Sequence, residues 1–139
     1  IYVISADQEN DADVLALVAA SYALSSSKIP FAGPIAGVRV GRLQGNWVLN
    51  PTFQQLQYSD MALVVAGSQD SIVMVEGGAL EVSEEDVVQA LTVAHDGIRE
   101  LIALQQQLVA QAEATPKIDW TRAEVPTTVA DRIRALAEG

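Results

Sequence analysis

Residues 60–67, DMALVVAG, are followed after Ser68, Gln69 and Asp70 by SIVMVEGG at residues 71–78. Two apolar runs joined by a short polar link predict two paired β-strands. Neither run alternates apolar with polar residues, which indicates that both faces are covered and predicts a central pair of the sheet. Asp60 opens the first run, which raises the question of whether it belongs to a catalytic site.

Upstream of this pair, GVRVGRL and NWVLNP flank Gln44-Gly45, which predicts a β-hairpin with glycine in its turn. Alternation in the first of these strands puts Arg39 on the face opposite to its valines. Residues 52–59 are too few for more than a turn or two of helix. Residues 1–6 are expected to form a strand, and residues 11–27 a helix covered on most faces. Asp11 or Asp13 is suited to its first turn.

Downstream, Ser83 precedes three acidic residues, which is typical of a helix start. Apolar residues at spacings of three and four then predict one long helix through residue 112. A last short helix is expected at residues 127–138. The predicted fold class is α/β (α+β), with a mixed β-sheet packed on helices.

The composition limits the classes of function. The chain has 139 residues, half of them hydrophobic, with no cysteine, eight Lys and Arg, 18 Asp and Glu, and a net charge of −10. Its scattered cations argue against nucleic-acid binding by this chain alone. No run approaches the roughly 18 apolar residues of a membrane helix, and no signal peptide is visible, which favours the cytoplasm. Because Ile1 resembles the middle of a strand, we expect a fragment whose N-terminus is missing.

The residues taken alone give no complete catalytic group. Acidic residues alternate from Asp7 to Asp13, but the glycine and glutamate of a calcium-binding EF-hand loop are missing, so a solvated acidic turn is the better interpretation. His95 is the single histidine and is expected to be a hydrogen-bonded helix residue. The glycines form no phosphate-binding motif. Trp47 and Trp120 lack a basic surround, which argues against stacking on bases.

Five segments in series carry a resemblance: KIPFAGPIAGVRVG, WVLNPT, DMALVVAG, VMVEGGALEVSEEDVVQALTVAHDGI and KIDW. Their order resembles the ribonuclease PH family and, within it, the first of the two ribonuclease-PH-like cores of the polynucleotide phosphorylases. The resemblance implies that residues 1–115 are part of this first, non-catalytic core. It implies that residues 116–139 are a linker and the start of an all-helical domain.

The same resemblance implies a nucleotidyltransferase that degrades RNA, mRNA included, as a phosphate-dependent 3′-to-5′ exoribonuclease. Its partners would be RNA, inorganic phosphate at the partner core, the remaining segments of the same enzyme, and two further copies in a homotrimeric ring, with no membrane. Mg²⁺ or Mn²⁺ would be held in the other core and none by this segment. This segment alone is expected to be inactive, supporting the ring and its RNA channel.

The catalytic positions of the family are expected to be lost here. The metal-binding aspartate and the lysine of the strand before Val-Ala-Gly fall on Ala62 and Val64, and a second acid falls on Leu56. The two phosphate-binding serines fall on Ala12 and Asp13. Asp60 is then a neighbour of the lost site.

For RNA contacts Arg39 and Arg42 are the candidates, although a solvated strand face is the simpler interpretation. An alternative function is a self-contained, non-catalytic ring subunit of an exosome-like RNA-degrading assembly. A third possibility, an unrelated small α/β enzyme, lacks any visible site.

Overall fold

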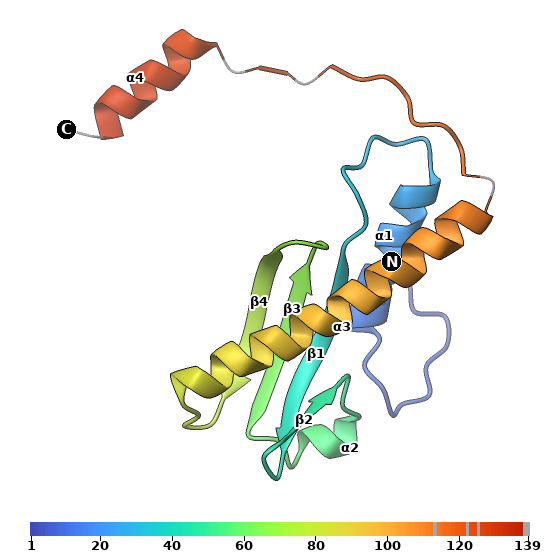
Figure 1. The fold of residues 1–139 in the computed structure, drawn as a ribbon, viewed down its shortest axis with the longest axis vertical. Coiled ribbons are helices and arrows are strands. Elements are labelled where there is room, and N and C mark those ends of the chain that lie inside the picture. Colours follow the sequence, from blue (N-terminus) through green and yellow to red (C-terminus); the bar gives the residue numbers. More distant parts are fainter. Residues whose placement is uncertain (113, 122, 125, 138–139) are drawn as a thin grey trace.

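The structure is a computed structural model that describes residues 1–112, 114–121, 123–124 and 126–137. It is an α+β fold of four strands and four helices within these ranges (Figure 1). The elements in chain order are α1 (Asp13–Ser26), β1 (Ala36–Leu43), β2 (Asn46–Leu49), α2 (Phe53–Leu56), β3 (Met61–Gly67), β4 (Ile72–Ala79), α3 (Glu84–Gln111) and α4 (Thr127–Ala137).

The strands form one sheet in the order β2-β1-β3-β4, and each pairing is antiparallel. Gln44 and Gly45 turn β1 into β2 with φ of 50° and 80°, the left-handed region that a tight two-residue hairpin requires. Register then places Val38 opposite Val65 and Arg39 opposite Val64. Because directly paired side chains share a face, the sheet has a valine-rich face and a face that carries Arg39.

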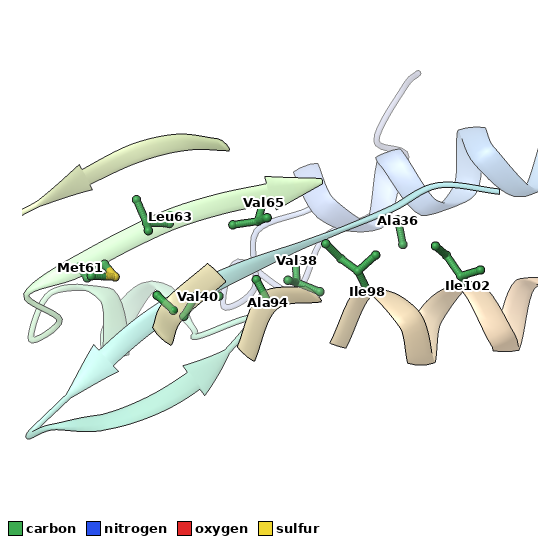
Figure 2. Close-up of a cluster of buried hydrophobic side chains, with 10 residues drawn as sticks. Ala36, Val38, Val40, Met61, Leu63, Val65, Ala94, Ile98 and Ile102 are labelled. Carbon is green, nitrogen blue, oxygen red and sulfur yellow. The ribbon is translucent and has the colours of Figure 1, made fainter. Parts of the chain in front are cut away.

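Helix α3 packs on the valine-rich face, across β1, β3 and β2. Figure 2 shows the resulting core, in which side chains of β1 and β3 meet one side of α3. The core residues are Ala36, Val38, Val40, Met61, Leu63, Val65, Ala90, Ala94, Ile98 and Ile102. Their burial supplies the main stabilising term of the fold, at about 25 cal/mol per Å² of apolar surface removed from water.

Several predicted elements are confirmed. The hairpin around Gln44-Gly45, the β3–β4 pair and the short helix after Pro51 are present. The long helix begins after Ser83, whose side chain accepts a hydrogen bond from the amide of Asp86 at 3.1 Å. The short helix near the C-terminus is α4, although the last predicted residue, Glu138, lies outside the described residues.

The predicted strand at residues 1–6 is wrong. These residues form no regular element, and Ile1, Tyr2 and Ile4 are each at least 80% exposed. A strand needs a neighbour for its amides and carbonyls, and none of the strands in the described ranges pairs with this segment.

The predicted mixed sheet is also wrong in detail, because each pair of neighbouring strands among the described residues is antiparallel. The β1–β2 and β3–β4 connections are short and suit antiparallel pairs, and the longer segment with α2 returns the chain so that β3 lies antiparallel beside β1. Of the two strands that the sequence predicted to be central, only β3 has a neighbouring strand on both sides. β3 lies between β1 and β4, but β4 is an edge strand with Val73 and Val75 66% and 48% exposed.

Helix α1 is less covered than predicted. It packs against β1 and α3, yet only Val14 and Ser21 of its residues are buried, while Leu15 is 69% exposed. Its apolar residues are distributed all round the helix, so covering one side leaves the others open. Within the part of the chain that the structure describes, no helix combines the length and the apolarity needed to cross a membrane.

Candidate functional site

Ala62 and Val64 of β3, where the resemblance placed the aspartate and the lysine of the family, lie on the sheet face that points away from α3. Val64 is in register with Arg39 of β1 on one side and Glu76 of β4 on the other, so these three residues share that face. Ala62 lies two residues earlier in β3 and therefore on the same face. Two aliphatic side chains here offer no ligand for a metal ion and no cation for phosphate.

The start of α1 is held against this face by two ion pairs to one guanidinium. Arg39 Nη2 donates to Asp11 Oδ2 at 3.0 Å and to Asp13 Oδ2 at 2.5 Å. The Arg39 side chain is only 16% exposed. These ion pairs hold the start of α1 next to the sheet, with Ala12 as the N-cap residue and Asp13 as the first helical residue.

Phosphate has no place at this helix start. Asp13 Oδ1 accepts from the amide of Val14 at 2.6 Å, and Asp11 Oδ1 accepts from the amide of Asp13 at 3.3 Å. The first amides of α1, which would otherwise attract an anion, are thus bound by carboxylates of the chain itself. A phosphate here would meet negative charge.

Leu56, where the resemblance placed a second acid of the family, lies half-buried in α2. A capping box fixes this short helix, since Thr52 and Gln55 exchange side-chain-to-backbone hydrogen bonds of 3.2 and 2.9 Å. The amide of Phe53 donates to the carbonyl of Glu9 at 2.9 Å, which joins α2 to the acidic loop before α1.

A divalent metal does not fit the residues present. Within the described ranges, no three His, Asp or Glu side chains gather in a way that could hold a metal ion. Asp11 and Asp13 share the single guanidinium of Arg39, so neither carboxylate is a free metal ligand. No catalytic step through a metal can be derived at this face.

Asp60 has a structural partner, which answers the question of its role. Asp60 accepts from Arg42 Nε at 3.0 Å and from Nη2 at 2.7 Å, and Arg42 Nη1 binds Asp86 Oδ2 at 2.6 Å. Arg42 also lies over Trp47, its cross-strand neighbour, 5.6 Å from the ring centroid. This group joins the first turn of α3 to the sheet, and Trp47 is therefore not the isolated aromatic that the sequence suggested.

The two candidate RNA-binding arginines lie on opposite faces of β1, because they are three residues apart. Each guanidinium binds two carboxylates, and each side chain is 16% exposed. The sequence did not reveal these ion pairs, because the carboxylates lie 18 to 44 positions away from the arginines that they bind. Of these contacts, the sequence could have predicted only the one between Arg42 and Trp47, because the two-residue turn places these residues opposite each other in the hairpin.

Hydrogen bonds with Arg42 hold the pKa of both Asp60 and Asp86 below the ordinary value of 3.8, and the carboxylates raise the pKa of Arg42. In the acidic loop, Asp7 accepts from the amides of Asn10 and Glu9, each at 2.8 Å. These bonds lower the pKa of Asp7 to about 2. The acidic segment is thus a turn closed by its own side chain.

The free energy of unfolding is expected to fall as the pH drops below 3.8. A carboxyl whose pKa is lowered by folding binds its proton more tightly in the unfolded chain, so its contribution is complete above 3.8 and is lost as the pH falls through the folded pKa. Urea unfolding from about pH 6 to about pH 2.5 measures this change. Arg42→Met should give a flatter pH dependence, with Asp7 contributing equally to both chains. Equal slopes in both chains would contradict the assignment.

His95 is hydrogen-bonded within the domain, as expected. Its Nε2 lies 3.2 Å from the carbonyl oxygen of Ser68, and Arg99 Nε donates to the carbonyl of Gln69 at 3.3 Å. Both contacts bind α3 to the turn between β3 and β4. His95 is a structural residue in this arrangement.

Residues 33–97 match the profile of the 3′ exoribonuclease family, domain 2. The matched range runs from the loop before β1 into α3 and contains the four-stranded sheet. This match places residues 33–97 in domain 2 of the 3′ exoribonuclease family.

Curated relatives extend the similarity to the whole chain. The polyribonucleotide nucleotidyltransferase of Gemmatimonas aurantiaca is 70% identical over 139 residues, which are 100% of this chain and 19% of the relative. That of Salinibacter ruber is 51% identical over 133 residues, 96% of this chain and 19% of the relative. The enzyme of Sulfurihydrogenibium azorense is 56% identical over 107 residues, 77% and 15% respectively.

Within its family, the chain is therefore homologous to a segment of the polyribonucleotide nucleotidyltransferases, and the resemblance carried by the sequence motifs is confirmed. The chain spans 19% of the length of the first two of these curated relatives.

Proposed function

We propose that this chain is the non-catalytic first core of a phosphate-dependent 3′-to-5′ exoribonuclease that degrades RNA in the cytoplasm. The observation that carries the proposal is the sheet face of Ala62 and Val64, where Arg39 is bound to Asp11 and Asp13. Ala62 and Val64 supply no group for metal or phosphate chemistry on this face. Phosphorolysis and its Mg²⁺ or Mn²⁺ belong to the other core, because attack by phosphate develops negative charge that a cation must neutralise.

The role of this segment is structural: it supports a homotrimeric ring and its RNA channel. Because the chain has a net charge of −10, it would repel the RNA backbone, which supports the proposal that other segments hold the RNA in the channel. Arg39 and Arg42 would contact RNA only if its phosphates replaced the carboxylates that the two arginines bind here. Residues 1–115 would form the core part, and residues 116–139 would lead into a helical domain.

A chimaera tests the proposal. The matching segment of the Gemmatimonas aurantiaca enzyme is replaced by this chain, and phosphate-dependent release of nucleoside diphosphates from an RNA 3′ end is measured. Activity within about threefold of the parent enzyme is expected, since the exchanged segment contributes packing and no reacting group. The chain alone, and its Val64→Lys variant, should release none, because several further positions of the site are also lost.

Phosphorolysis by the isolated chain would refute the assignment of the chemistry to another core. A folded chimaera that forms the parent's assembly but has no activity would show that this segment contributes to the reaction. A native chain that assembles on its own into a ring with other subunits would favour the exosome-like alternative.

A further inference from the structure

Lys117 binds the C-terminal end of α1, 90 to 93 positions earlier in the chain. Its Nζ donates to the carbonyl oxygens of Leu24, Ser25 and Ser27, at 2.8, 2.9 and 2.8 Å. Helix α1 ends at Ser26 and has no basic residue in its last turn. The last carbonyls of a helix and the negative end of its dipole attract a cation, and Lys117 supplies it.

Two backbone hydrogen bonds flank this contact. The amide of Thr115 donates to the carbonyl of Ser26 at 3.3 Å, and the amide of Ile118 donates to the carbonyl of Lys28 at 3.0 Å. In the described part of the chain after Ile118, the hydrogen bonds are local to residues 126–137. Residues 115–118 are thus the last attachment of the C-terminal segment to the domain in these ranges.

Apolar packing holds this attachment only weakly. Ile118 and Trp120 are 52% and 63% exposed. Lys117 lines two neighbouring hollows of about 290 and 580 Å³, which also share Phe31. With open space on both sides, the polar bonds to the end of α1 fix the position of the segment.

We propose that Lys117 is a positioning residue, which fixes the point and the direction in which the C-terminal segment leaves the domain. An ammonium group suits the task because it offers three donors, each to a different carbonyl, and its bonds are charge-assisted. This role is independent of RNA chemistry and of the proposed function.

The test measures the exit direction in the 139-residue chain. The chain contains no cysteine, so Glu85→Cys in α3 and Asp119→Cys after the attachment give one pair of nitroxide labels. Both positions are exposed. Electron–electron distance measurements should give one narrow distribution with Lys117 or Lys117→Arg, and a broad one with Lys117→Met. Lys28→Met is the matched control, because it removes a nearby lysine with no bond to these carbonyls, and its distribution should stay narrow.

Hydrogen exchange gives a second readout that needs no label. The amides of Thr115 and Ile118 should exchange about tenfold faster in Lys117→Met, with β3 unchanged. If Lys117→Met does not fold, exchange in the native chain still tests the proposal. The amides of Thr115 and Ile118 must then exchange more slowly than those of Asp119 and Thr121. Unprotected native amides, or an unchanged distribution in a folded Lys117→Met, would overturn the proposal.

Discussion

Replacing Gly77 with alanine is expected to lower the free energy of unfolding by about 3 kcal/mol or more. Gly77 has φ of +148°, a region that residues with a Cβ rarely adopt. A Cβ at this position would also collide with the backbone of β3, at the carbonyl oxygen of Ala62 and 2.9 Å from the Cα of Leu63. Neither group can rotate away, so the β3–β4 pairing itself must open.

Gly78→Ala is the matched control. Gly78 is the next residue of the same strand, its φ is not in the left-handed region, and a Cβ there meets nothing within 4 Å. Its effect should stay within about 0.5 kcal/mol. Urea unfolding followed by circular dichroism measures both variants. If the two alanine variants were equally stable, the tight approach of Gly77 to β3 would be refuted.

Local patterns predicted the elements that depend on local interactions. The β1–β2 hairpin follows from Gln44-Gly45, whose turn needs positive φ at both residues. Helix α3 follows from its Ser83 cap, its acidic first turn and its apolar spacing. Each of these signals acts within a few residues, so a single sequence is sufficient to read it.

The errors concern neighbours that are distant in the chain. Residues 1–6 have the composition of a strand, but a strand exists only when another strand pairs with it. The apolar run of β4 predicted a strand covered on both faces, yet in this chain β4 lies at the sheet edge. Composition reports what a segment can bury and does not report which segment covers it.

The candidate site shows the same division. The resemblance alone predicts that Ala62 and Val64 stand where the family has a metal ligand and a lysine. The ion pairs of Arg39 were not, because Asp11 and Asp13 lie 28 and 26 positions away and meet it only through the fold. The structure thus adds that this sheet face carries ion pairs within the domain, in which the largely buried Arg39 binds two partly exposed carboxylates.

Replacing Ile98 with alanine should lower the free energy of unfolding by about 2–5 kcal/mol, through lost burial and the cavity left behind. Ile98 is fully buried where α3 meets the sheet, between Ala94 and Ile102 (Figure 2). Ile98→Val removes one methylene and should lower the stability by about 1 kcal/mol. A domain of this size has only about 5–15 kcal/mol in total, so the alanine variant would be close to unfolding in mild denaturant.

Leu104→Ala gives the matched control on the same helix. Leu104 is 51% exposed, and alanine has the higher helix propensity, so its stability should change by less than about 1 kcal/mol. Chemical denaturation of the three variants and the parent chain measures the series. Similar losses at Ile98 and Leu104 would mean that α3 is covered on both sides. A large loss at Ile98 alone means that the helix is fixed by the one face that meets the sheet, and that Leu104 lies on its open side.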